Sequence, residues 1–183
     1  MIQSSTFSAL TGPSALSTFR AARLLASIRA IEKSADSLCA RFVHFIHASR
    51  PLDQTESARL EALLTYGEAA ATADTKAVSF MVVPRLGTIS PWSSKATDIA
   101  RNTGLAAVQR IERGTLYRVK FVRRTALDAA MVAPIASVLH DRMTESVIDA
   151  VTDPALLFRE LDSKPMQTVP MLPRTRGIGA RKC

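Results

Sequence analysis

The sequence predicts an α+β domain in which helices cover one side of a mostly antiparallel sheet. Helical and strand-like patterns alternate along the chain, and a predicted hairpin interrupts that alternation. Of the 183 residues, 47% are hydrophobic, which is enough for the core of one domain. We expect this domain to span residues 1–160, and residues 161–183 to form a loose tail with three prolines and no helical pattern.

The first half is predicted to contain two helices and one strand. Apolar residues at three- and four-residue steps predict a helix over Ser14–Lys33, and the aromatic and β-branched run Leu38–His47 predicts a strand. Asp53 and Glu56 have the spacing of a capping box, in which each side chain accepts a hydrogen bond from the other residue's backbone. The helix that follows is expected to stop at Gly67.

The centre of the chain is predicted to form a strand, a loop and a helix. The apolar run Ala77–Val83 predicts a buried strand, which Pro84 ends because proline has no N–H for a strand ladder. Gly87 then supplies a flexible turn. A helix over Ser90–Thr103 begins with serine as its N-cap and Pro91 at its first position.

A hairpin is predicted next, with arms Ala106–Arg113 and Thr115–Val122 that turn at Gly114. Polar and apolar residues alternate in its second arm, as they do in a strand with one buried face. The remaining predicted elements are a long helix that starts at Thr125–Asp128 and contains Pro134, a short strand or turn around Val147–Val151, and a helical turn at Pro154–Phe158.

The formal charge of +8 suggests nucleic-acid binding, but its location favours another interpretation. Five of the 24 basic residues lie in residues 164–183, which contain no acid, so 19 basic and 16 acidic residues remain in residues 1–163. A nucleic-acid-binding fold is expected to carry a basic face on the fold itself. No apolar run reaches the ~18 residues of a membrane helix. Two cysteines form no disulfide framework, and we expect a cytoplasmic protein.

Hydroxyl groups and a cation gather at the start of the central helix. They are Ser90, Ser93, Ser94 and Lys95. A helix N-terminus with such side chains suits an anionic group. Two simpler interpretations stay open, because Lys95 and Asp98 are spaced to pair on a helix surface and Trp92 is suited to a core.

The usual arrangements of catalytic residues are not recognisable. His44 and His47 lie three apart in a predicted strand, so their side chains are expected on opposite faces, where they cannot share a metal ion. No cluster of Cys, His and carboxylate residues has ligand spacing. No glycine-rich phosphate loop occurs either. We therefore expect no metal site and no catalytic residue in this chain.

The central motif, Gly87–Ala100, reads Gly-Thr-Ile-Ser-Pro-Trp-Ser-Ser-Lys-Ala-Thr-Asp-Ile-Ala. It resembles the signature of the N-terminal domain of phosphoribosylformylglycinamidine synthase (FGAM synthase) in its large single-chain form. Leu86 departs from the family, which usually has proline there, so the loop is expected to be less rigid. Shorter matches elsewhere in the chain occur in the same order as in the family. They are Gly12–Arg20, Val43–Phe45, Leu60–Gly67, Arg110–Gly114 and Leu139–Glu145.

The resemblance implies a fold of two similar halves, like a fused dimer of the small FGAM synthase accessory subunit. It also implies a reaction in which formylglycinamide ribonucleotide, glutamine and ATP give FGAM, glutamate, ADP and phosphate. In the family, ATP and Mg bind to a synthetase core, and a glutaminase domain makes the ammonia. Neither part is recognisable here, so we expect this chain to bind no cofactor and to be inactive alone. We expect it to be a natural truncation, a frame-shifted gene model or an excised fragment, with residues 161–183 as the start of the family's linker and a disordered, truncated tail.

The role that the resemblance implies is to position the synthetase core and the glutaminase domain. Interface anchors are commonly tryptophan and arginine, so we favour docking over ligand contact for the central motif. The residues expected to face the neighbouring domains or a ligand are Arg85, Thr88, Ser90, Trp92, Ser93, Ser94, Lys95, Thr97 and Asp98. The alternative is a free-standing, non-enzymatic module that self-associates or binds a synthetase core in trans.

Overall fold

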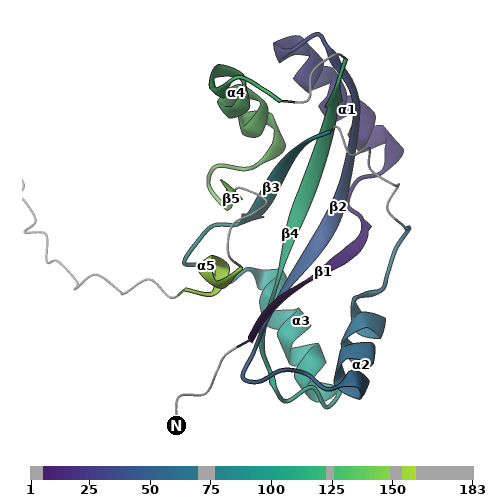
Figure 1. Cartoon of the computed structure of the whole chain (residues 1–183), viewed down its shortest axis with the longest axis vertical. Coiled ribbons are helices and arrows are strands. Elements are labelled where there is room, and N and C mark those ends of the chain that lie inside the picture. The colour runs from purple at the N-terminus through teal and green to yellow at the C-terminus, as the bar shows by residue number, and fades with distance from the viewer. Residues whose placement is uncertain (1–5, 70–76, 123–125, 149–153, 160–183) are drawn as a thin grey trace, which may run out of the picture.

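The computed structural model describes residues 6–69, 77–122, 126–148 and 154–159, within which five strands form one antiparallel sheet (Figure 1). The strand order is β1-β2-β4-β3-β5. The strands are β1 (Thr6–Ser14), β2 (Ala35–Ala48), β3 (Val78–Pro84), β4 (Val108–Phe121) and β5 (Glu145–Ile148). The helices are α1 (Thr18–Ile31), α2 (Gln54–Leu64), α3 (Pro91–Asn102), α4 (Ala129–Leu139) and α5 (Ala155–Phe158). The predicted α+β class is confirmed.

Four of these helices share one face of the sheet. Alternate residues of a strand point to the same face, and on β4 that face carries Ile111, Val119 and Phe121. Val119 and Phe121 pack in a cluster with residues of α1 and α4, whereas Ile111 packs with residues of α2 and α3. The short helix α5 lies on the opposite face, where Leu157 and Phe158 cover part of β2 and β3.

The described chain repeats its order of elements. β1-α1-β2-α2 is followed by β3-α3-β4-α4, and the long strands β2 and β4 pair along the middle with Val43 opposite Gly114. Each long strand has the outer strand of its own half on its other side. This order agrees with two similar halves, and the likeness to a fused dimer of accessory subunits stays a prediction.

The two ends of the sheet differ in how their helices pack. At one end α1 contacts α4, and Ile28 of α1 is buried with Ile135 and Leu139 of α4. At the other end α2 and α3 make no comparable contact and lie apart over the sheet (Figure 1). A hydrogen bond from Arg59 of α2 to the carbonyl of Thr103, 2.9 Å long, joins them where α3 ends. The second helix pair therefore approaches less closely over the sheet than the first does.

The predicted hairpin at Gly114 is wrong. Residues 108–121 form a single strand, β4, and Gly114 lies in its middle. A Cβ atom at this position would lie 2.9 Å from the carbonyl oxygen of Val82 and 3.0 Å from the ring of Phe45. Glycine is therefore required here because neighbouring atoms approach closely, and not because the chain turns.

Most other predicted elements are present with shifted ends. The Asp53–Glu56 capping box has both of its hydrogen bonds, and Gly67 and Gly87 have the positive φ angles of turns. β1 was not predicted, because its sequence is polar and contains Pro13. The predicted stripe of the first helix is only partly buried, since Ile28 is buried and Phe19 is 74% exposed. Thr125 and residues 149–153 lie outside the described residues.

Candidate functional site

The helix of the central motif, α3, sits where β3 stops pairing with β4. β3 pairs with β4 from Val78 to Val82. Farther along β4, α3 takes over as its neighbour: the backbone N–H of Ile111 donates to Thr97 Oγ1 at 3.0 Å, and the guanidinium of Arg101 donates to the carbonyl of Val108 at 3.2 Å. α3 therefore satisfies backbone groups of β4 that a strand would otherwise pair.

The start of α3 is tied to a buried carboxylate. Ser90 Oγ accepts from the backbone N–H of Ser93 at 3.0 Å and donates to Glu112 Oε2 at 2.8 Å. Glu112 is 1% exposed and forms a salt bridge with Arg110, which also donates to the carbonyl of Thr88 at 2.7 Å. The anionic group that faces the positive end of α3 is therefore the protein's own Glu112.

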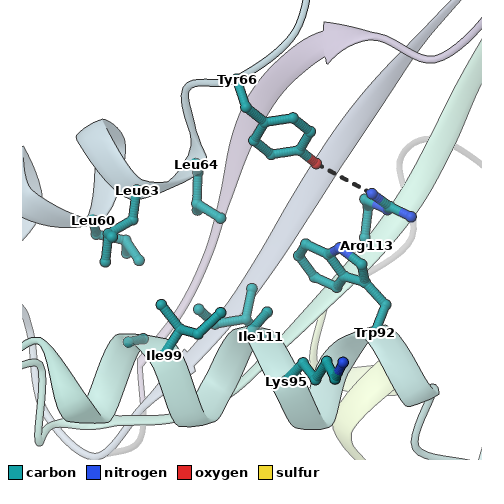
Figure 2. A pocket seen from close by; sticks show the side chains of 11 residues that line it. Leu60, Leu63, Leu64, Tyr66, Trp92, Lys95, Ile99, Ile111 and Arg113 are labelled. Atoms are coloured by element: carbon teal, nitrogen blue, oxygen red, sulfur yellow. Dashed lines mark hydrogen bonds between the residues drawn. The ribbon is translucent and has the colours of Figure 1, made fainter.

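Trp92 lies in a cluster of aromatic rings and one guanidinium drawn from β2, α3, β4 and the loop after α2. Figure 2 shows three of its members, Trp92, Tyr66 and Arg113. Its ring stacks on His44, with centroids 5.6 Å apart, and the guanidinium of Arg113 lies 4.6 Å from the Trp92 centroid and 4.3 Å from that of Phe42. Arg113 Nη1 donates to Tyr66 Oη at 3.3 Å, and this oxygen shares a 2.9 Å hydrogen bond with His44 Nε2. The contacts fix Trp92 and Arg113 in place.

His44 is wholly buried beneath this cluster. Burial, together with repulsion from Arg113, lowers the pKa of His44 to about 4, so its imidazole is neutral at pH 7. A Cβ atom on Gly12 would lie 2.5 Å from the His44 ring, which shows how closely β1 packs on it. His47 points to the other face of the sheet and stacks on Phe7, as predicted from the spacing of the two histidines.

A groove of about 380 Å³ runs between α2 and α3 beside this cluster (Figure 2). Its lining is mostly apolar, with a tyrosine and two cations. A second hollow of about 440 Å³ lies on the far side of Trp92 and Arg113, between the start of α3 and the loop before β5. The groove is lined by Leu60, Leu63, Leu64, Tyr66, Trp92, Lys95, Ala96, Ile99, Ala100, Ile111 and Arg113.

The side chains predicted for the site divide into two sets. Ser93 and Thr97 are buried on the side of α3 that faces the sheet, and Ser90 and Trp92 are half-buried. Lys95 and Asp98 form no ion pair with each other in the described part of the chain, so the predicted surface pair is not formed. The exposed set is Arg85, Thr88, Ser94, Lys95 and Asp98. Which of them contact a ligand or another domain stays a prediction.

Four residues of the cluster were not predicted as site residues, and one of them, Phe42, lies outside the family-like segments. His44, Tyr66 and Arg113 each fall in one of the short segments that resemble the FGAM synthase family. The structure brings these segments together around Trp92, and Figure 2 shows Tyr66 and Arg113 beside it. Because these three residues lie in segments that resemble the family, the sequence could have indicated them as site residues.

Among the described residues, no group of three or more His, Cys, Asp or Glu side chains is placed to hold a metal ion. No helix in that part of the chain has the length and apolar character needed to cross a bilayer.

The sheet, its single layer of long helices and the groove beside the central motif define an α+β domain with a solvent-open apolar hollow. Residues 41–158 match the family model of the formylglycinamide ribonucleotide amidotransferase N-terminal domain, and they make up more than half of the chain. The chain therefore belongs to this family. That amidotransferase is FGAM synthase, so the match confirms the resemblance of the central motif and implies a role in purine biosynthesis.

Proposed function

We propose that this domain positions the synthetase core and the glutaminase domain of FGAM synthase, and that the exposed side of the central motif is its docking surface. The observation that carries the proposal is a set of apolar side chains open to solvent in and beside the central motif. Ile89 is 61% exposed, Ile99 54%, Leu86 36% and Met143, in the loop before β5, 74%. Exposed apolar patches rimmed by polar residues are typical of protein interfaces.

Docking agrees with the contacts of the motif better than direct ligand binding does. The positive end of α3 faces Glu112, and the hydroxyl groups of Ser90 and Thr97 are hydrogen-bonded within the domain. An external phosphate would therefore compete with a buried carboxylate for that end of the helix. The exposed side chains of the motif include the apolar residues Ile89 and Ile99 among polar ones, and this mixture suits a protein partner.

The proposal assigns no chemical step to this chain. ATP and Mg belong to the synthetase core of the family, and the ligation itself is proposed to take place there. The described residues offer no set of metal ligands that fits Mg, so none of them is given a role toward it. We also propose that the domain works in the cytoplasm.

A substitution at Lys95, which is exposed on α3, distinguishes docking from direct ligand contact. The lysine that corresponds to it in an intact FGAM synthase is replaced by alanine, and turnover is measured with glutamine and with ammonia. We expect glutamine-dependent turnover to fall while ammonia-dependent turnover is retained. The matched control is alanine in place of Arg23, an exposed cation of α1. A rise in the KM for the ribonucleotide alone would contradict docking.

A direct binding measurement tests the positioning role itself. The domain is mixed with a chain that contains the synthetase core and glutaminase but lacks this domain, and complex formation is followed by analytical ultracentrifugation. We expect a stable complex. A homodimer that does not bind the added chain would instead support the alternative of a free-standing module.

A further inference from the structure

We propose that the groove between α2 and α3 receives a segment of the docked protein that inserts apolar side chains and presents a carboxylate to Lys95 and Arg113. This inference rests on the proposed function and specifies the chemistry of the partner surface. It reverses the expected role of Trp92, which becomes a wall of the receiving groove instead of an anchor that enters the partner.

The groove exists because the second helix pair does not close. At the other end of the sheet, Ile135 and Leu139 of α4 pack with Ile28 of α1 over the same face. Over Ile111, which lines the groove, α2 and α3 approach less closely than α1 and α4 do, although the order of elements in the two halves is the same. A segment from outside would supply the packing that α1 and α4 give each other.

The lining of the groove suits apolar side chains. Leu63, Ala96 and Ile99 form its two sides, and Ile99 is 54% exposed on α3 (Figure 2). The hydroxyl of Tyr66 is already hydrogen-bonded to His44 and Arg113. Few hydrogen-bonding groups are therefore left to orient a small polar ligand, and burial of apolar area is the main gain on binding.

The charges at the rim specify an acidic partner. Lys95 and Arg113 both line the groove, and no aspartate or glutamate does. Within the described part of the chain, the two salt bridges are Arg50–Glu56 and Arg110–Glu112, so neither rim cation is paired. Because Arg113 is held between the rings of Phe42 and Trp92, its guanidinium is already positioned for a carboxylate.

Trp92 is poorly placed to act as an inserted anchor or as a stacking platform. His44 and Arg113 both lie against its ring, which is half-buried. A nucleobase or other aromatic ligand would have to displace one of these contacts. A protein segment that fills the space beside the ring leaves them intact, and we therefore commit to a protein occupant.

The test compares two exposed isoleucines that face different hollows. Ile99→Asp places a carboxylate in the groove, whereas Ile89→Asp makes the same change in the neighbouring hollow. Binding of each full-length variant to the synthetase–glutaminase chain is measured by calorimetry, and folding is checked by circular dichroism. We expect Ile99→Asp to weaken binding by about 30-fold or more, and Ile89→Asp, which changes the docking surface outside the groove, to weaken it at least about 5-fold less than Ile99→Asp does.

A charge exchange tests the acidic character of the partner. We expect Lys95→Glu to weaken binding by about 10-fold at low salt and by less at high salt, with Arg23→Glu, an exposed cation of α1 outside the groove lining, as the control. A photo-crosslinker at position 99 is expected to capture a peptide of the synthetase–glutaminase chain that contains apolar residues and an acidic one.

Three results would overturn the inference. They are unchanged binding of Ile99→Asp, a loss of binding confined to Ile89→Asp, and a crosslink to a second copy of the domain. The first two would leave the proposed function standing, because the wild-type domain would still bind. Failure of the wild-type domain to bind the synthetase–glutaminase chain would instead contradict the proposed function.

Discussion

The indole of Trp92 lies on the imidazole of His44, with ring planes 27° apart and centroids at 5.6 Å. This contact connects the first turn of α3 to the middle of β2, which are far apart in sequence. His44 in turn reaches Tyr66, beyond the end of α2, by a hydrogen bond. Trp92 and Tyr66, which both border the groove, are therefore held by one buried histidine.

Acid is expected to destabilise the domain through His44. Its folded-state pKa of about 4 lies below the usual 6.5, so between these values the unfolded chain binds a proton that the folded chain does not. The free energy of unfolding should therefore fall as the pH falls from about 6.5 to 4, by roughly 3 kcal/mol at most. Urea unfolding across this range checks the prediction.

The control for this prediction is a histidine on the other face of the sheet. Burial and Arg110 also lower the pKa of His47, so wild-type protein and His47→Gln should both lose stability as the pH falls. His44→Gln should show a clearly flatter dependence on pH. Equal slopes for His44→Gln and wild type would contradict the assignment.

Removal of the charge at Glu112 is expected to destabilise the domain strongly. Glu112→Gln leaves the guanidinium of Arg110 without its buried carboxylate, and such a loss costs roughly 3 kcal/mol. Thermal unfolding measures the effect. Glu56→Gln, which breaks the more exposed pair with Arg50, should reduce the stability less. An equal loss of stability in the two variants would show that burial of an ion pair does not determine the cost of breaking it.

The hydroxyl of Thr97 is expected to stabilise the contact between α3 and β4. Thr97→Val keeps the shape of the side chain but leaves the N–H of Ile111 without its acceptor, at a cost of about 1–3 kcal/mol. Thr97→Ser keeps the acceptor and should cost less. Urea unfolding of the two variants provides the comparison, and equal loss would assign the effect to the methyl group instead.

Gly114→Ala is expected to destabilise the sheet. The added Cβ atom would lie within 3.0 Å of the carbonyl oxygen of Val82, and overpacking of this kind costs about 1–3 kcal/mol. The urea midpoint of the variant measures the change. A midpoint equal to that of wild type would show that the strands move apart without cost.

Elements with local signals could be predicted from the sequence. The capping box needs only Asp53 and Glu56, and the start of α3 needs only Ser90 and Pro91, so neighbouring residues determine both. The predicted hairpin is wrong because glycine is expected both in a turn and in a strand whose neighbours leave no room for a side chain. The sequence alone does not distinguish these two cases. The crowding at Gly114 comes from Val82, which lies on another strand.

The site was predictable in outline but not in the orientation of its side chains. Ser93, Thr97 and Ala100 recur at helical spacing, which could have shown that this side of α3 faces the sheet. The pairing of Thr97 with Ile111 depends on the end of β3 and could not be read from the sequence. The contacts that join His44, Tyr66 and Arg113 likewise arise only in the folded chain.

The pairing of β2 with β4 gives the domain a stiff axis. Each of these strands has 14 residues, so the pair is about 45 Å long, and it runs along the length of the molecule from one helix pair to the other (Figure 1). A protein seated in the α2–α3 groove would consequently be held at a set separation from anything that touches α1 and α4. The domain would act as a strut between two bodies, and its length would determine how far apart they stand.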